Sequence, residues 1–296
     1  MSRQAPHILG EVLFDCFPDG SRVLGGAPFN VAWHLAGFGR DPLFLSAVGD
    51  DEPGREILAR MKSHGMRTEG VRIHPSLGTG RVDVKNAESS PEYHFPERSA
   101  WDEFSPDGIP SDATPSILYQ GTLFMRHEVS REASLALAKS ASCPRFVDVN
   151  LRAPWFDPGH VKELVTGVHC LKASDEELGM LAGWFGIETV GGREETARRL
   201  LEAASIHHAL ITLGADGAVW ITADGGVHHA AAASVRDFVD SVGAGDASAA
   251  VALLGLTENW PVPLILERAM RFAAAICEIP GAIPDDHKPY HETLRS

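Results

Sequence analysis

The chain of 296 residues lacks an apolar run long enough to cross a membrane, and it has few cysteines. A membrane-spanning helix needs about 20 apolar residues, and the polar start of the chain lacks the apolar core of a signal peptide. The four cysteines, Cys16, Cys143, Cys170 and Cys277, lie far apart without a CxxC pair. This spacing favours free thiols in a reducing compartment, so we expect a cytoplasmic protein.

Basic residues are also scarce, with 26 Lys and Arg against 40 Asp and Glu and a net charge of −14. This balance argues against general binding to nucleic acid or to an anionic membrane. A local cradle of backbone N–H groups can still hold phosphates without net positive charge. Residues 8–30 contain no GxGxxG motif after the first expected strand, which argues against a dinucleotide dehydrogenase. The 14 histidines form no pattern typical of a zinc site.

Strand-like and helix-like apolar segments alternate along most of the chain. Alternation of this kind predicts an α/β fold with a mostly parallel sheet and helices on both faces. We expect strands at 8–14, 42–48, 117–119, 145–149, 170–172, 208–213 and 218–222. We expect helices at 27–38, from an N-cap at Asp51 to Gly65, and at 130–140, 158–167, 175–184, 193–203, 246–256 and 263–277.

Two regions depart from this alternation. Residues 70–104 contain short strand-like pieces separated by Gly, Ser and Pro, and we interpret these as narrow strands outside the main core that form a lid. The last dozen residues are rich in Pro, His and Asp and are expected to form a loose tail.

Residues 240–250, DSVGAGDASAA, contain a small-residue loop that runs directly into an apolar helix. Free N–H groups and the positive end of the helix dipole make such a junction an anion site, and Gly243, Ala244 and Gly245 let a phosphate approach the backbone. Asp246, in the first turn, would repel a phosphate, so we interpret it as a base that takes a proton from the attacking group. The alternative is an ordinary turn whose acid complements the dipole.

A second glycine-rich segment, GGAPFN, opens the helix at 27–38. Gly26 lets the backbone come near a ligand, and Asn30 can donate and accept at once, which suits a polyhydroxylated molecule. Asp15 follows the first expected strand, where α/β sheets place ligands. The alternative is a simple turn beside a solvated acid.

Three further segments follow strand ends. DVNLR at 148–152 offers an acid, an amide and the guanidinium of Arg152, which can bind hydroxyls or steady a charge. Ser174 and Glu177 are either a capping box or a pair in which Glu177 holds Mg²⁺ through water. ITLGADG at 211–217, with Thr212, Gly214 and Gly217, suits phosphate or ribose contacts, or is simply a hairpin.

In their order along the chain, GGAPFN, DVNLR, KASDEE, ITLGADG and DSVGAGD resemble the ribokinase-like (phosphofructokinase B) carbohydrate kinase family, from Gly10 to about Pro284. Within that family, GEVLFD, AWD, GTLFMR and DVNLR look most similar to bacterial fructokinases. The resemblance implies a three-layer α/β sandwich with a mostly parallel central sheet. It implies one kinase domain, 1–296, with a small β lid from about 16–24 and 70–104.

The resemblance also implies a role for each motif residue. Asp246 would be the catalytic base, and the backbone N–H groups of Gly243, Ala244 and Gly245 would stabilise the transferring phosphoryl group. Asp15, Gly26, Asn30 and Arg152 would bind the sugar. Ser174, Glu177, Thr212, Gly214 and Gly217 would face MgATP, with Glu177 near Mg²⁺, while Asp240 and the carbonyl of Val242 would hold a monovalent cation such as K⁺.

We therefore expect an ATP-dependent sugar kinase that acts on a primary hydroxyl, with D-fructose as the best single substrate and fructose 6-phosphate as the product. The alternatives are a kinase for ribose, 2-keto-3-deoxygluconate or a nucleoside, because the hydroxyl-binding residues suit several sugars and Arg152 could equally meet a carboxylate. A non-catalytic sugar- or nucleotide-binding member is the alternative from another class. The expected partners are sugar, ATP and a second copy of the chain, since exposed lid edges favour pairing.

Overall fold

The computed structural model describes residues 3–85, 92–107, 109 and 113–295. A nine-stranded sheet runs through the described chain. Its strands are β1 (Arg3–Leu9), β4 (Leu43–Gly49), β5 (Val71–His74), β8 (Ala113–Gly121), β9 (Arg145–Asp148), β10 (Cys170–Ser174), β11 (His208–Thr212), β12 (Ala218–Thr222) and β13 (Val227–Ala230). They are ordered β13-β12-β11-β10-β9-β8-β1-β4-β5, and only β12 and β13, at one edge, run antiparallel to their neighbours. The expected mostly parallel sheet is confirmed.

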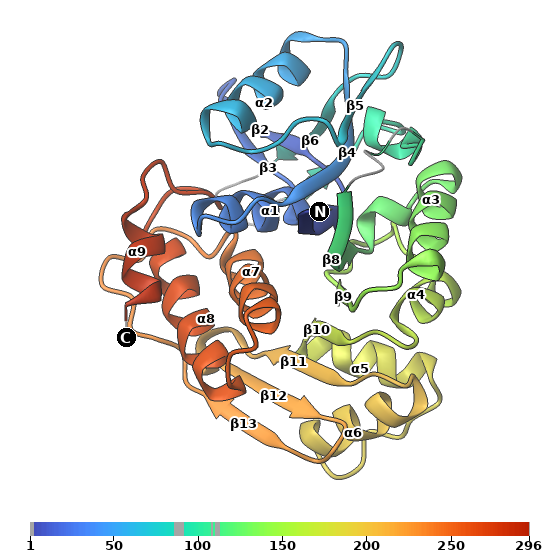
Figure 1. Ribbon diagram of the computed structural model, residues 1–296, viewed down its shortest axis with the longest axis vertical. Coiled ribbons are helices and arrows are strands. Elements are labelled where there is room, and N and C mark those ends of the chain that lie inside the picture. The colour runs from blue at the N-terminus through green and yellow to red at the C-terminus, as the bar shows by residue number, and fades with distance from the viewer. Residues whose placement is uncertain (1–2, 86–91, 108, 110–112, 296) are drawn as a thin grey trace.

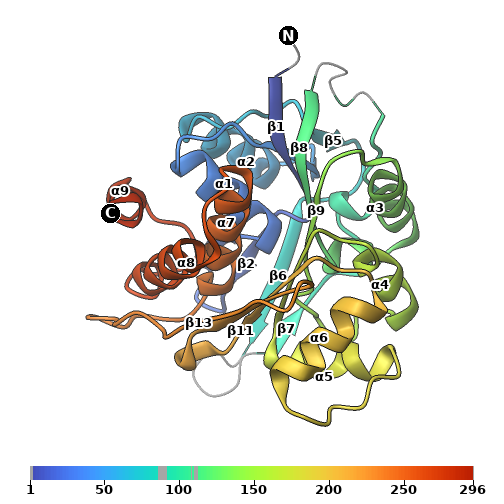
Figure 2. The ribbon, with the colours of Figure 1, turned by 60° about the horizontal axis from the view of Figure 1, so that its bottom comes forward.

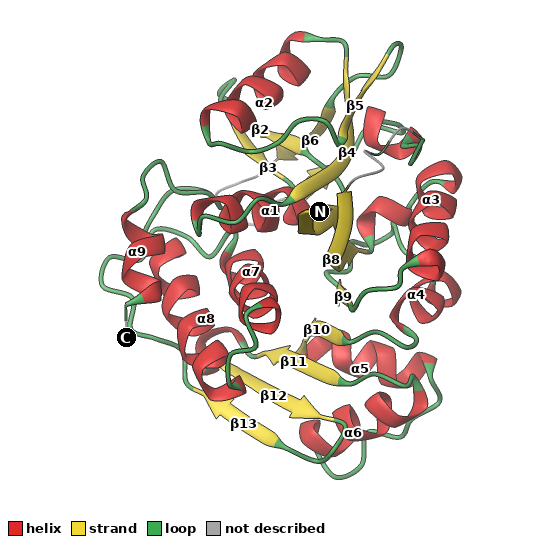
Figure 3. Ribbon diagram, viewed as in Figure 1, coloured by secondary structure: helices red, strands yellow, loops and turns green. Residues whose placement is uncertain are grey.

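Helices lie on both sides of this sheet (Figure 3). They are α1 (Ala27–Gly37), α2 (Glu52–Ser63), α3 (Glu128–Ser140), α4 (Pro158–Val165), α5 (Asp175–Trp184), α6 (Arg193–Ala203), α7 (Ala244–Thr257), α8 (Val262–Ile276) and α9 (Lys288–Leu294), with short 3₁₀ turns η1 (Ala100–Glu103), η2 (Leu123–Met125) and η3 (Gly214–Asp216). In Figure 2, α1, α7 and α8 lie on one side of the strands and α3 to α6 on the other. The chain is therefore a three-layer α/β sandwich.

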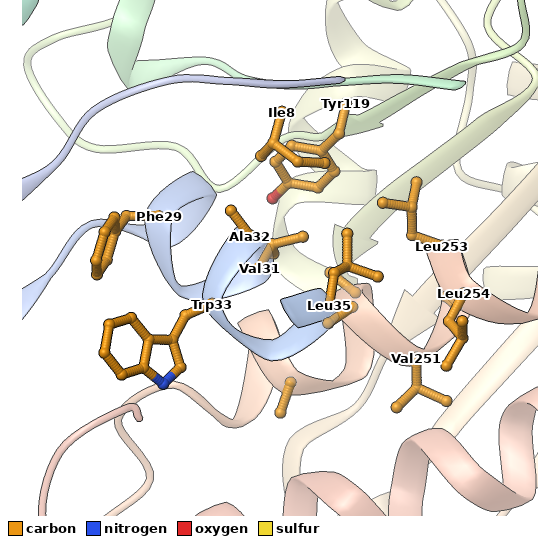
Figure 4. Packing of buried hydrophobic residues seen from close by; sticks show 14 of the residues in the cluster. Ile8, Phe29, Val31, Ala32, Trp33, Leu35, Tyr119, Val251, Leu253 and Leu254 are labelled. Carbon is orange, nitrogen blue, oxygen red and sulfur yellow. The ribbon is translucent and has the colours of Figure 1, made fainter. Parts of the chain in front are cut away.

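The larger core lies on the α1 and α7 side. Helix α7 is apolar around its whole circumference and is buried from Ala247 to Gly255, as expected for a helix in the interior of a protein. Figure 4 shows Val251, Leu253 and Leu254 of α7 facing the side chains of α1, with Ile8 and Tyr119 of the sheet beside them. This packing brings the first turns of α1 and α7 together.

A second, four-stranded sheet lies beside the large one, in the order β3-β2-β6-β7. It consists of β2 (Leu13–Cys16), β3 (Arg22–Gly25), β6 (Gly80–Lys85) and β7 (Glu92–His94). In Figure 1 it lies near the top of the molecule, together with α2. Exposure alternates along β6, so one face of this sheet is buried and the other faces outward.

Two strand predictions were wrong. The strand expected at 8–14 is two strands, because the chain leaves the large sheet after Leu9 and enters the small sheet at Leu13. A Cβ at Gly10 would lie 2.1 Å from Cγ of Pro28, so only glycine fits at this crossing. The segment Val71–His74 does not belong to a separate lid, since it pairs with β4 at the edge of the large sheet.

The prediction of a loose tail was also wrong. Residues 288–294 form α9, and Tyr290 is 1% exposed. Its ring packs on Phe38 and Phe272, and its hydroxyl lies 3.1 Å from Nδ1 of His34. Within the described residues, no helix is both long and apolar enough to cross a bilayer.

Candidate active site

The turn into α7, which we call the cradle, lies at the residues where the sequence predicts an anion site. Gly243 caps this helix with φ of 80°, and a Cβ there would lie 2.4 Å from Cβ of Ala282. The Ala244 N–H, expected from the sequence to be a free donor, instead donates to the Ser241 carbonyl at 3.3 Å and closes the turn. The N–H groups of Gly245 and Asp246 lie in the first turn, where an α-helix offers no acceptor. The cradle thus presents free donors and the positive end of a dipole.

Asp246 stands at this cradle and contacts the first turn of α1. Its Oδ2 accepts a 2.7 Å hydrogen bond from Nδ2 of Asn30, a residue 216 positions away in the sequence. Burial raises the pKa of Asp246 to about 6, although the Asn30 hydrogen bond works in the opposite direction. Oδ1 of Asn30 is buried and has no partner in the described part of the chain, so it is free to accept a hydrogen bond from a ligand. The two residues therefore place a buried carboxylate next to a free amide oxygen.

Asp15 and Arg152 complete this side of the site. Asp15 lies on β2 of the small sheet, and burial raises its pKa to about 6 while the charge of Arg152 lowers it. Arg152 is exposed in the loop after β9, and its charge lowers the pKa of Asp246 as well. Gly26 caps α1 with φ of 111°, and a Cβ there would lie 2.6 Å from the Glu11 carbonyl oxygen. Residues from both sheets therefore meet at the N-terminus of α1.

Glu11 was not assigned a role from the sequence, although it lies in the GEVLFD motif. It is 3% exposed, and its Oε2 has no hydrogen-bond partner within the described residues. Burial raises the pKa of Glu11 to about 7, and the nearby charge of Asp246 raises it further. The motif alone could have indicated it, because a carboxylate inside an otherwise apolar strand pattern is unusual.

A buried ion pair lies beside the cradle. Nζ of Lys172 bonds both oxygens of Asp148, at 2.9 and 2.7 Å, and the Tyr119 hydroxyl donates to the same carboxylate. Asp148, which the DVNLR motif suggested as a ligand for hydroxyls, is 1% exposed and fully engaged. Nζ of Lys172 lies 3.6 Å from the position of a Cβ on Gly245, and its pKa is raised by Asp148 against the effect of burial. A fixed cation therefore lies next to the free N–H groups of α7.

Ser174 and Glu177 form the capping box that was the alternative interpretation. Oγ of Ser174 accepts from the Glu177 N–H at 3.1 Å, and Oε2 of Glu177 accepts from the Ser174 N–H at 2.8 Å. The other oxygen of Glu177 accepts from the Leu151 N–H at 2.7 Å. Glu177 thus anchors the loop that carries Arg152.

The remaining predicted residues lie at a strand end, in a turn and in the loop before α7. Thr212 ends β11, and Gly214 and Gly217 lie in the turn of an antiparallel hairpin. A hairpin was the alternative interpretation of this segment. Gly217 has φ of 96°, and a Cβ there would lie 2.0 Å from the Ala230 carbonyl oxygen, so local packing alone requires glycine. Asp240 accepts from the N–H groups of Val242 and Gly281, at 2.7 and 3.3 Å, and ties the loop before α7 to the chain after α8.

The mostly parallel sheet with helices on both faces defines an α/β protein, in which the N-terminus of α7, the buried Lys172 and Asp246 lie close together. This arrangement is typical of a site for an anionic group. Residues 17–289 match the family described as pfkB family carbohydrate kinase, and the chain belongs to this family. The resemblance drawn from the motifs is thereby confirmed.

Individual relatives agree with this assignment. The chain is 31% identical to the fructokinase of Klebsiella pneumoniae, over 85% of this chain and 84% of that protein. It is 28% identical to the aminoimidazole riboside kinase of Salmonella typhimurium, over 88% and 84% of the two chains. The crystal structure of a fructokinase from Vibrio cholerae O395, with fructose, ADP and calcium bound, superimposes with a TM-score of 0.83 at 23% identity over the whole of both chains. Relatives of similar identity thus carry the names of kinases for different sugars.

Proposed function

We propose that this chain is an ATP-dependent fructokinase that transfers the γ-phosphoryl group of MgATP to the primary hydroxyl of D-fructose and forms fructose 6-phosphate. The observation that carries the proposal is the Asn30–Asp246 pair at the N-terminus of α7. It places a carboxylate and a set of free N–H donors at one point, which is what phosphoryl transfer to an alcohol requires. The name of the bacterial relative at 31% identity supports fructose among the possible sugars.

Asp246 accepts the proton of the sugar hydroxyl as its oxygen attacks the γ-phosphorus and the bond to the leaving ADP breaks. Negative charge on the phosphoryl oxygens is stabilised by the N–H groups of Gly245 and Asp246 and by the dipole of α7. Gly243 and Ala244 hold the turn that orients these donors. Lys172 adds a buried positive charge beside Gly245.

The sugar is held from three sides in this proposal. Asn30 accepts a hydroxyl at its free Oδ1, Asp15 accepts another from the small sheet, and Arg152 donates from the loop after β9. Gly26 lies so close to the Glu11 backbone that no side chain fits there. The sugar can therefore approach the backbone at the start of α1. The small sheet would act as the lid that excludes water from the phosphoryl group.

MgATP would lie along the loops after β10 and β11, against Ser174, Thr212, Gly214 and Gly217. Mg²⁺ keeps several water ligands and is bound through few carboxylates together with substrate phosphates. Both oxygens of Glu177 already accept backbone N–H groups, so a contact to Mg²⁺ through water is the arrangement that fits. Asp240 and the Val242 carbonyl remain our candidates for a monovalent cation such as K⁺, since their loop leads directly into the cradle.

The test is ADP release measured with a panel of acceptors: D-fructose, D-ribose, 2-keto-3-deoxygluconate and aminoimidazole riboside. We expect the highest kcat/KM with D-fructose, and fructose 6-phosphate as the product by NMR. A higher kcat/KM with another acceptor would replace fructose while keeping the kinase. No acceptor-dependent ADP release with any of them would favour a non-catalytic member.

We further propose a cytoplasmic homodimer. The four cysteines are free, which suits a reducing compartment. The small sheet turns one face outward and leaves β3 and β7 as edge strands, and Val23 on β3 is 37% exposed. We expect sedimentation equilibrium to give a mass twice that of one chain, which is 31.8 kDa. Val23→Lys should shift the protein toward the monomer mass. A wild-type protein that stays at the monomer mass up to tens of micromolar would contradict the dimer.

A further inference from the structure

A cavity of about 180 Å³ opens between η2, the start of α3 and the first turn of α4. Figures 1 and 2 show α3 and α4 side by side, on the opposite face of the sheet from α7 and α8. Its described lining does not include Asp246, Asn30 or Arg152. The cavity is therefore separate from the proposed sugar and phosphate sites.

Arg126 lines this cavity and is held rigidly in place. Its side chain is fully buried, and its Nε and Nη2 donate to the two oxygens of Asp102, at 2.8 and 2.5 Å. Its Cζ lies 4.3 Å from the ring centre of Trp101 and 5.0 Å from that of Trp155. One edge of the guanidinium is thus bound by a carboxylate, and its planar group lies against two aromatic rings.

The third nitrogen of Arg126, Nη1, is buried and has no hydrogen-bond partner in the described chain. Buried polar groups are nearly always paired, and an unpaired donor on a charged group is especially unfavourable. Since a guanidinium can only donate, the missing partner has to be an acceptor oxygen. Arg126 lines a cavity, so a ligand in that cavity can supply the oxygen.

The other polar groups around the cavity favour an anion. Among the described residues that line it, Arg131 and His160 stand with one carboxylate, Asp157. Asp157 is the N-cap of α4 and accepts from the His160 N–H at 3.0 Å, so its charge serves the helix start. The positive end of α4 faces the same space. Phe156 and Val161 supply apolar walls for a carbon portion.

We propose that this cavity is a second ligand site, for a small oxyanion of the phosphate-ester or carboxylate class, bound by Nη1 of Arg126 and by Arg131. Trp155 lies in the same loop as Arg152, so occupancy would change the affinity for the sugar, and by reciprocity the sugar would change the affinity for the anion. That consequence rests on the proposed function, whereas the site itself does not.

The experiment is ¹⁹F NMR of the full chain labelled with 5-fluorotryptophan, without ATP or sugar. The Trp155 line is assigned with Trp155→Phe and followed while inorganic phosphate, glycerol 3-phosphate or malonate is added, with sodium chloride at equal ionic strength as the blank. Arg131→Gln removes one charge at the cavity rim, and Lys139→Gln, on an exposed position of α3 outside the cavity, is its matched control.

We expect a saturable shift of the Trp155 line, with a midpoint about 10-fold higher in Arg131→Gln and unchanged in Lys139→Gln. Saturation with the two phosphates alone would assign a phosphate ester, and saturation with malonate alone a carboxylate. The proposal is overturned if none of the three anions saturates the shift. It is equally overturned if Arg131→Gln responds like the wild type, because the anion then acts from elsewhere, for example from the α7 cradle.

Discussion

At the scale of single residues, the proposed function depends on a carboxyl group, that of Asp246, whose ionised form is disfavoured by burial. Asp246 is a stronger base than an exposed aspartate because burial raises its pKa to about 6, yet it stays mostly ionised at neutral pH. The Asn30 hydrogen bond fixes its orientation. Basicity and orientation together are what a general base needs.

We expect Asp246→Asn to lower kcat by about 10²–10⁴-fold while leaving the KM values for sugar and ATP within a few-fold. The amide occupies the same space but cannot take the proton. The measurement is steady-state ADP release, with ATP binding checked by calorimetry. A rate near that of the wild type would remove Asp246 from the role of base.

The pH dependence of kcat/KM should follow the same carboxyl group, because this constant reports ionisations of the free enzyme. Below its pKa of about 6 Asp246 is protonated and cannot accept a proton, so kcat/KM should fall as pH drops through about 6 and level off above 7. Asp15 has a similar pKa, so Asp15→Asn is the control: it should raise the sugar KM but keep the inflection in kcat/KM. If the inflection disappears in Asp15→Asn, it belongs to Asp15, and our assignment of the inflection to Asp246 is wrong.

At the scale of secondary-structure elements, the anion cradle depends on how α7 begins. Gly243 is the N-cap of α7 and Gly65 follows the C-cap of α2. Both have positive φ, of 80° and 78°, but of the two only Gly243 has close neighbours. A Cβ at Gly65 would meet nothing within 4 Å, whereas one at Gly243 would lie 2.4 Å from Cβ of Ala282. Substitutions at these two glycines therefore separate the effect of backbone strain from that of a steric clash.

We expect Gly65→Ala to reduce the free energy of unfolding by about 1 kcal/mol without affecting turnover. Gly243→Ala should cost about 2–4 kcal/mol and also lower kcat, since the turn that orients the donors of α7 has to shift. Urea denaturation and ADP release measure the two effects. Equal losses of stability in both variants would show that Ala282 does not constrain the cradle.

Elements with strong internal patterns could be predicted from the sequence. The helices at 175–184 and 193–203 have the expected bounds because apolar spacing and end signals agree there. The crossing at Gly10 and the pairing of β5 could not be predicted, since a period of two residues does not say which sheet a strand joins. At the candidate site, the motifs predicted roles for Asp246 and Asn30 but not the contact between them. The ion pair of Lys172 with Asp148 could not be predicted either, because it depends on β9 and β10 being neighbours in the sheet.

At the scale of the whole molecule, the last helix of the described chain, α9, packs on α1 and α8. Tyr290 of α9 reaches the buried His34 of α1 and packs on Phe272 of α8. A Cβ at Gly37 would lie 2.3 Å from Cζ of Tyr290, so the ring lies directly on the backbone of α1. The sequence showed only a polar segment, because a seven-residue helix with two buried side chains has too weak a pattern.

Because α1 also carries Asn30, the docking of α9 supports the helix on which the site depends. We expect Tyr290→Phe to cost about 1–2 kcal/mol of unfolding free energy, through the unpaired Nδ1 of His34, and Tyr290→Ala about 3–5 kcal/mol, through the cavity it leaves. His291→Ala, at an exposed position of the same helix, should stay within about 0.5 kcal/mol. Thermal and urea unfolding measure all three. If Tyr290→Ala is no more destabilising than His291→Ala, α9 is not docked on α1 in solution, and the core of the molecule ends with α8.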